Sequence, residues 1–136
     1  MGDFSQAREF ALSLPGTAEQ PHFDMTSFRV RGKIFATATA DETRLHVFVD
    51  ESEVAATVAE HSGPQHGGDR EPLAFEPLLW GQRVRGLRIT LAAAPNDRVR
   101  ELLAEAWRRK AGPRLVAQFD AAGGPYAGGA HADGRE

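Results

Sequence analysis

The eight residues FRVRGKIF at positions 28–35 constrain the fold more than any other stretch of the chain. Apolar and basic residues alternate before the glycine and an apolar run follows it, which predicts two short strands joined by a tight turn. In such a hairpin Phe28 and Val30 face a core, while Arg29 and Arg31 face water and Lys33 adds a third positive charge at the tip. The segment therefore predicts one piece of antiparallel sheet and a surface that suits anions.

The residues around this hairpin predict a meander of three strands within positions 21–49. The strands are expected at 26–31, 34–39 and 44–49, and the short connections favour antiparallel pairing. A further strand is expected at 86–92. Residues 73–80 contain Pro77 and follow Pro72, so they are interpreted as an irregular segment or an edge strand.

Helical periodicity appears in four places. A first helix is expected over 4–14 and ends at Pro15-Gly16, with Asp3 and Gln6 as its capping pair. A second begins at Asp50. The clearest helix has apolar residues at i, i+3, i+4, i+7 and i+8, namely Val99, Leu102, Leu103, Ala106 and Trp107. A short final helix is expected over 114–120. The predicted fold is α+β, with an antiparallel sheet of about five strands packed against the N-terminal helix and the C-terminal helices.

A chain of 136 residues fits a single domain, which we place at 1–120. Residues 62–72 form a loop rich in Gly and Pro, and the Ala/Gly-rich residues 121–136 are expected to be a disordered tail. The chain has no Cys, no apolar run near the ~20 residues that span a bilayer, and no signal-peptide pattern at its start. We therefore expect a cytoplasmic protein without a membrane partner, and a monomer is favoured.

The charges are unevenly distributed along the chain, although the net charge is only −3. Residues 41–76 carry nine acids and two bases, whereas residues 77–114 carry three acids and nine bases. Such a dipolar domain can present a positive face despite its negative total.

A set of basic residues on two segments is the strongest candidate for a binding surface. Arginine presents a planar fork that suits phosphate oxygens, so we expect these residues to bind DNA or RNA if the two segments are neighbours in the sheet. The set consists of Arg29, Arg31, Lys33, Arg83, Arg85 and Arg88. The alternative is a solvated face whose charges pair with the acids of residues 41–76, and such pairs contribute little.

Other features favour a binding protein over an enzyme. No nucleophile motif, phosphate-binding glycine loop or set of His with metal-ligand spacing occurs, so no catalytic residue, cofactor or metal is expected. The cations Arg108, Arg109 and Lys110 are interpreted as partners of a helix dipole, with a phosphate-contacting edge as the alternative. Trp80 is interpreted as half-buried at the edge of the core. The alternative function to nucleic-acid binding is a small-molecule or protein-interaction module that uses a cleft near Trp80 and the 62–72 loop. A small enzyme without a recognisable motif is the third possible function.

The order and spacing of these pieces resemble a known family. The segments LPGT at 14–17 and F-x-V-x-GK-x-FA at 28–36, followed by Pro77, Trp80-Gly81, the strand 87–91 and the helix ending near Trp107, are similar to the MmcQ/YjbR-like family of small bacterial proteins. The resemblance covers about residues 4–120. It implies a compact α+β fold likened to a double-wing DNA-binding motif and to frataxin-like domains, with no catalytic residues to assign.

Overall fold

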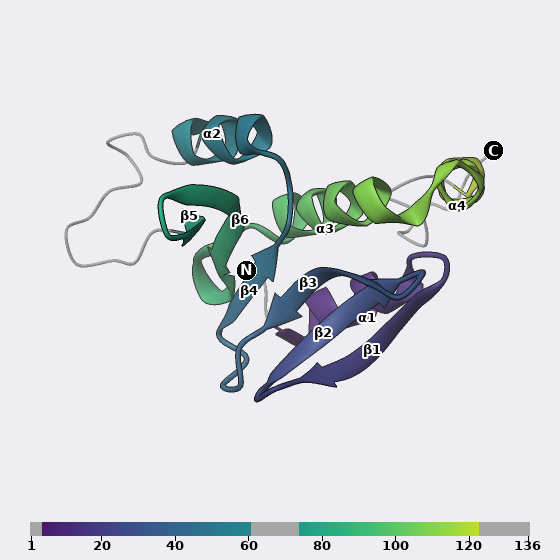
Figure 1. The fold of residues 1–136 in the computed structure, drawn as a ribbon, viewed down its shortest axis with the longest axis horizontal. Coiled ribbons are helices and arrows are strands. Elements are labelled where there is room, and N and C mark those ends of the chain that lie inside the picture. Colours follow the sequence, from purple (N-terminus) through teal and green to yellow (C-terminus); the bar gives the residue numbers. More distant parts are fainter. Residues whose placement is uncertain (1–3, 61–73, 123–136) are drawn as a thin grey trace.

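The computed structural model describes residues 4–60 and 74–122, which form one sheet covered on one side by helices (Figure 1). The loop over 62–72 and the capping residue Asp3 lie outside the described residues. Of the expected tail over 121–136, only Ala121 and Ala122 are described, and Ala121 belongs to a helix rather than to a disordered tail. The elements are α1 (Phe4–Ser13), β1 (Thr17–His22), β2 (Met25–Val30), β3 (Lys33–Ala38), β4 (Arg44–Val47), α2 (Glu51–Glu60), β5 (Phe75–Trp80), β6 (Arg83–Thr90), a 3-10 turn (Leu91–Ala93), α3 (Asn96–Ala111) and α4 (Pro113–Ala121). The predicted α+β class is confirmed.

The described sheet has six strands in the order β1-β2-β3-β4-β6-β5, and every pair is antiparallel. The added strand is β1, whose sequence TAEQPH shows no apolar alternation because it lies at an edge with mostly polar, half-exposed residues. At the opposite edge, β5 carries Pro77, where an edge strand can lack one backbone donor. The alternative of an edge strand for this segment was therefore correct.

The FRVRGKIF segment forms the β2–β3 hairpin. Val30 pairs with Lys33, and the two loop residues Arg31 and Gly32 both have positive φ, as a tight two-residue hairpin turn of type I′ requires. Phe28 and Val30 are buried, as the alternation predicted. A bulge follows Phe28, so that Phe35 and Ala36 are both buried rather than alternating.

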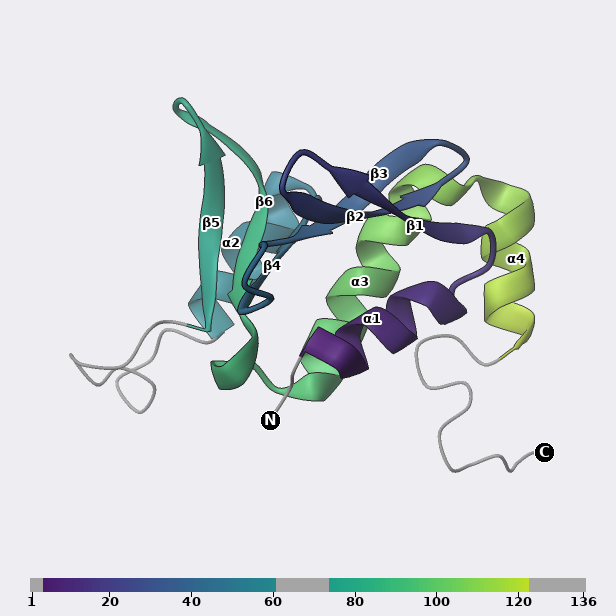
Figure 2. The same ribbon diagram turned by 90° about the horizontal axis from the view of Figure 1, so that it is seen from below.

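Helices cover one face of the sheet, and the hydrophobic core lies between the two layers (Figure 2). Helix α3 packs against β3 and α1, while α2 packs against β5 and β6. Trp107 of α3 is fully buried, donates its indole N–H to the Pro15 carbonyl at 3.0 Å, and meets Phe119 of α4 edge-to-face. The helix that periodicity identified most clearly thus supplies the centre of the core.

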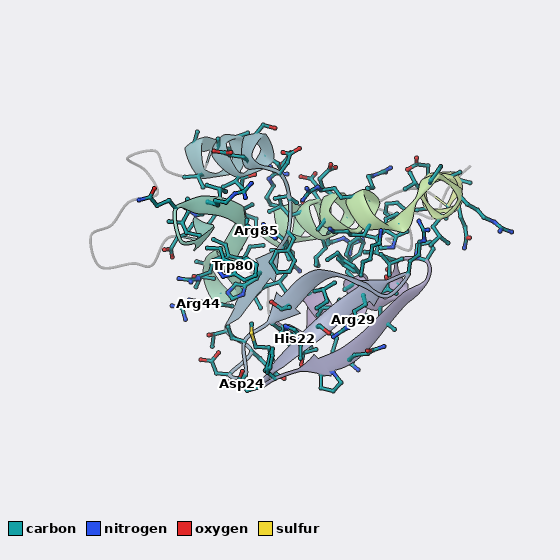
Figure 3. All side chains as sticks on the ribbon, in the orientation of Figure 1. His22, Asp24, Arg29, Arg44, Trp80 and Arg85 are labelled. Atoms are coloured by element: carbon teal, nitrogen blue, oxygen red, sulfur yellow. The ribbon has the colours of Figure 1, made fainter. Side chains whose placement is uncertain are left out.

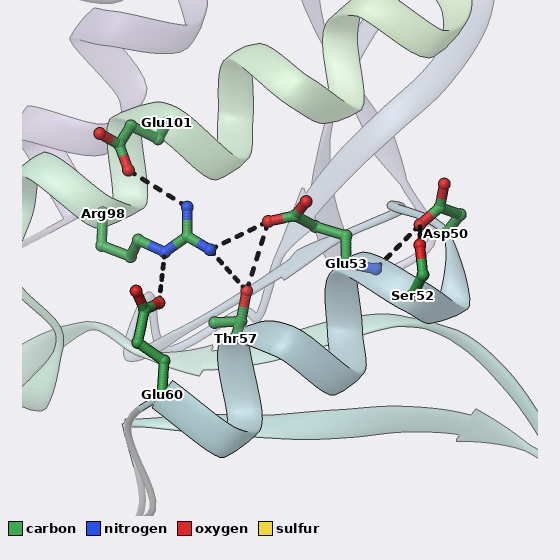
Figure 4. A network of polar contacts seen from close by, with 7 residues as sticks. All are labelled: Asp50, Ser52, Glu53, Thr57, Glu60, Arg98 and Glu101. Carbon is green, nitrogen blue, oxygen red and sulfur yellow. Dashed lines mark hydrogen bonds and ion pairs between the residues drawn. The ribbon is translucent and has the colours of Figure 1, made fainter.

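A polar network joins α2 to α3 on the same side of the sheet (Figure 4). Asp50 caps α2 by accepting a hydrogen bond from the Glu53 backbone N–H at 2.9 Å, which confirms the expected start of this helix. From α3, Arg98 forms ion pairs with three carboxylates and donates to the Thr57 hydroxyl; the three are Glu53, Glu60 and Glu101. This network fixes α2 over β5 and β6 and leaves the opposite face of the sheet open.

Candidate functional site

The face of the sheet opposite the helices carries a polar row that crosses every strand. Strand register places one residue from each strand in this row, and cross-strand partners point to the same side. From β1 to β5 the row reads Gln20, Ser27, Thr37, His46, Arg88 and Glu76. Ser27 and Thr37 at the centre of the row are buried, whereas the other four residues are exposed or half-buried. We call this side of the sheet the open face.

Three arginines lie on the open face because their strand neighbours are buried on the other side. Arg29 of β2 lies between buried Phe28 and Val30, and its Nε donates to the Ser27 hydroxyl at 3.0 Å. Arg44 precedes buried Leu45 on β4, and Arg88 of β6 lies between buried Leu87 and Ile89. All three side chains are half-buried, so the sheet holds their stems while the polar ends remain accessible.

His46 lies within this positive surface. Its Nδ1 is 3.4 Å from the Thr37 hydroxyl, and the ring is half-buried. Burial lowers the pKa of His46 below its ordinary value, and the positive charges of Arg88 and Arg44 lower it further. The imidazole is therefore neutral at physiological pH, and its pKa is sensitive to the field of these two arginines.

A cleft of about 610 Å³ opens beside the row, with both edges of the sheet contributing to its walls. Its basic lining residues come from the β5–β6 hairpin and from the end of α3, namely Arg83, Arg85, Arg109 and Lys110. The acids Asp50 and Glu51 at the start of α2 line the same cleft. An adjoining pocket of about 320 Å³ is lined mainly by apolar groups of the open face, including Met25, Phe48 and Leu78. Both hollows share His22, Thr37, Phe48, Trp80 and Arg85, so they form one continuous depression, which we call the open-face cleft.

Trp80 and Arg85 both line the open-face cleft, and Figure 3 labels the two side chains close together near β5 and β6. The indole of Trp80 is 71% exposed, which corrects the interpretation of a half-buried residue at the core edge. The Arg85 guanidinium carbon lies 4.9 Å from the centre of the indole ring, within the range of a cation–π contact. The alternative of Trp80 as a cleft residue matches its position.

The arginines of the open face and the β5–β6 hairpin differ from three arginines of the helices in their ionic partners. Arg8, Arg98 and Arg108 each pair with a carboxylate. Within residues 4–60 and 74–122 no such ion pair is formed by the arginines of the open face and the β5–β6 hairpin, which are Arg29, Arg44, Arg83, Arg85 and Arg88. Glu76 is the cross-strand neighbour of Arg88, but the two side chains form no ion pair. The described acids of residues 41–76 therefore form no direct ion pair with these five arginines, although Asp50 and Glu51 line the same cleft.

The structure brings only part of the predicted basic set together. Strands β3 and β4 separate β2 from β6, so the two arginine segments are not neighbours, although Arg29 and Arg88 share the open face. Arg31 lies in the β2–β3 turn, where its Nη1 would be 2.6 Å from a Cβ placed on Gly112 at the α3–α4 junction. Lys33 is exposed at the start of β3.

Sequence reasoning missed Arg44 and His46 as members of the basic surface. The signal was present in the alternation of strand 44–49, which places Leu45 and Val47 on one side and these two residues on the other. The contribution of His22 depends on the curvature that brings the end of β1 toward β5, and this has no local signature.

The cleft shows no constellation typical of catalysis by a metal. Among the described residues, no three His, Asp or Glu side chains are grouped as a bound metal ion would need. Nor does any helix in the described part of the chain have the length and apolar character needed to cross a membrane. The basic side chains around the cleft can bind anions, and the exposed indole of Trp80 can stack on an aromatic ring.

The fold and site define a class of α+β domain with helices on one face of an antiparallel sheet and a basic cleft on the other. The sequence model of the YjbR family matches residues 12–109, and the chain belongs to this family, as its motifs indicated. The chain is similar to the crystal structure of the Deinococcus radiodurans protein DR2400, which has a DUF419 domain, with a TM-score of 0.64, 21% identity and 96% of each chain covered. At this identity the likeness shows the fold alone. No curated protein matches the chain.

Proposed function

We propose that this YjbR-family domain is a non-catalytic protein that binds DNA or RNA, with the open face of its sheet against the phosphates. The observation that supports this most is the group of arginines on and beside that face without ionic partners among the described residues. Neutralising phosphates releases counterions, and this release supplies sequence-independent affinity. The cytoplasm is the proposed compartment, in keeping with a chain that has no cysteine for disulfides.

The phosphate-binding surface proposed here contains five arginines, whereas the sequence predicted a set of six basic residues. Arg29, Arg44 and Arg88 supply the charges on the sheet, and Arg83 and Arg85 supply those of the hairpin. Arg31 has no part in it because it lies by the α3–α4 junction. Lys33 contributes only to the potential at the hairpin tip.

A second candidate function is the binding of a small anionic molecule. The volume of about 610 Å³ favours it, since small-molecule pockets commonly measure roughly 300–1,000 Å³. Basic and aromatic lining groups would then act on one compact ligand. The two functions differ in the length of ligand that is needed for binding.

The test is a titration of fluorescently labelled single-stranded and duplex DNA by anisotropy at several salt concentrations. We expect affinity to fall steeply between ~50 and ~200 mM salt, and the double variant Arg29→Gln/Arg88→Gln to lower the salt slope by about 1.4 on a single strand. The matched control is Arg8→Gln/Arg108→Gln, which removes two cations from the helical side and should leave the slope unchanged. Absence of binding at low salt by folded protein would overturn the proposal.

A further inference from the structure

Trp80 is exposed although the fold supplies no structural reason for its exposure. It ends the edge strand β5 next to a two-residue turn, where a smaller polar residue would pair equally well with Arg83. The other tryptophan, Trp107, is completely buried. A large aromatic surface left in water beside a cleft is a common feature of binding sites.

The Arg85 side chain orients this indole. A bulge after Leu78 makes Arg85 the extra residue of β6, which carries its guanidinium over the Trp80 ring. Trp80 as a residue is 71% exposed, which leaves one face of its indole open to a planar ligand. We call this pair the platform: an indole ring oriented by the guanidinium of Arg85, with one face available for stacking.

The pocket beneath the platform suits a base more than a phosphate. Its lining includes Met25, Phe48 and Leu78, with the Thr37 hydroxyl and the neutral His46 as polar groups. Arg85 is the one arginine or lysine among the described residues that line this pocket, and the other cations lie on the flanking sheet row and along the cleft wall. This separation of an apolar, aromatic pocket from surrounding arginines matches a nucleotide, whose base is planar and uncharged and whose phosphate is anionic.

Resting on the proposed function, we propose that Trp80 and Arg85 bind an unpaired base, so that the domain prefers single-stranded over duplex nucleic acid. The base stacks on the open face of the indole, and the strand continues over the arginines of the open face. In a duplex every base is stacked and paired, so the pocket is reached only by extruding a nucleotide, which costs free energy. Base–aromatic stacking is tolerant of sequence, and the proposal therefore includes no sequence preference.

The experiment compares an oligothymidine single strand, a duplex of equal length and thymidine monophosphate as ligands of the full chain. We expect the single strand to bind more tightly than the duplex, and the monophosphate to bind much more weakly than either. Trp80→Ala should weaken single-strand binding about tenfold, within a range of ~5- to ~100-fold, and leave duplex binding nearly unchanged. Trp80→Phe should restore most of the loss because it retains a ring.

Phe23→Ala is the matched control. Phe23 is 92% exposed on the β1–β2 turn and is not among the residues that line the cleft, although its ring meets that of the cleft residue His22 edge-on. Its loss removes an exposed aromatic side chain and leaves both Trp80 and Arg85 in place. Intrinsic fluorescence gives an independent readout, since Trp107 is buried and only Trp80 is accessible to stacking. Single strands should quench the emission of the wild type but not that of Trp80→Phe.

The outcomes separate this inference from the proposed function. Equal affinity for single strand and duplex, with no effect of Trp80→Ala but a loss in Arg29→Gln/Arg88→Gln, would overturn the base platform and leave phosphate binding intact. Binding of the monophosphate as tightly as the oligonucleotide would assign the pocket to a free nucleotide and overturn the strand preference. No binding of either nucleic acid would overturn both proposals.

Discussion

Replacing Gly86 with alanine would push the backbones of β4 and β6 apart. A Cβ at Gly86 would lie 3.1 Å from the Phe48 Cα and the Val47 carbonyl carbon, and the carbonyl oxygen of Val47 would be closer still. These are backbone atoms at the point where the chain leaves β4, so no side-chain rotation relieves the overlap. The sheet must shift where β4 pairs with β6.

The expected cost follows from this geometry. Overpacking against rigid neighbours typically costs about 1–3 kcal/mol, and we expect Gly86→Ala to lie at the upper end, about 2–3 kcal/mol. Gly32→Ala is the matched control: its φ of +77° disfavours alanine, but no atom lies within 4 Å of the new Cβ. It should cost only about 1 kcal/mol, the penalty of a left-handed backbone, while both changes equally reduce the entropy of the unfolded chain.

Urea unfolding followed by circular dichroism measures both free energies of unfolding. For a domain of this size about 1 kcal/mol corresponds to ~3–5 °C, so Gly86→Ala should also lower Tm by about 6–15 °C. A Gly86→Ala protein whose stability lies within ~0.5 kcal/mol of the wild type would show that β4 and β6 do not approach as described. A larger loss in Gly32→Ala than in Gly86→Ala would contradict the ranking.

Three further predictions concern the core, the helix network and pH. Trp107→Phe should lower the free energy of unfolding by about 2–4 kcal/mol in urea titrations, because it leaves a cavity and a part-buried Pro15 carbonyl without its donor. A loss below ~1 kcal/mol would contradict the hydrogen bond. Arg98→Met should cost about 2 kcal/mol, since three carboxylates lose their shared cation, and a neutral result would show that the network does not hold α2. The pKa of His46 is lower in the folded protein than its ordinary 6.5, so the unfolded chain binds the proton first as pH falls. The stabilisation is therefore complete above pH 6.5 and is lost as pH falls through the folded pKa, and His46→Gln should flatten this part of the stability–pH curve.

The elements with strong periodicity could be predicted from the sequence. The apolar stripe of helix α3 is the face that the structure buries, with Trp107 fully buried in the core. The helical pattern and the tertiary packing therefore select the same structure for this segment. The start of α2 was equally clear because Asp50 caps it with a local hydrogen bond. Strand β1 was missed, since an edge strand with polar side chains is held by backbone pairing to β2 rather than by burial.

The candidate site depended more strongly on tertiary structure. Alternation was sufficient to place Arg29 and Arg88 on the solvent side of their strands. The separation of these strands by β3 and β4, however, follows from sheet order, which no local pattern encodes. The position of Arg85 over Trp80 depends on a bulge in β6, so the pair could not be foreseen from the spacing of the two residues.

The most direct test of phosphate binding at the open face is a backbone NMR titration of the ¹⁵N-labelled protein with an unlabelled oligonucleotide at low salt. The largest amide shifts should occur in the row across the sheet, at Ser27, Thr37, His46 and Arg88, and the His46 pKa should rise because the bound phosphates offset the charges of the neighbouring arginines. Shifts confined to α1 and α4, with the pKa of His46 unchanged, would contradict the assignment of the open face as the binding surface.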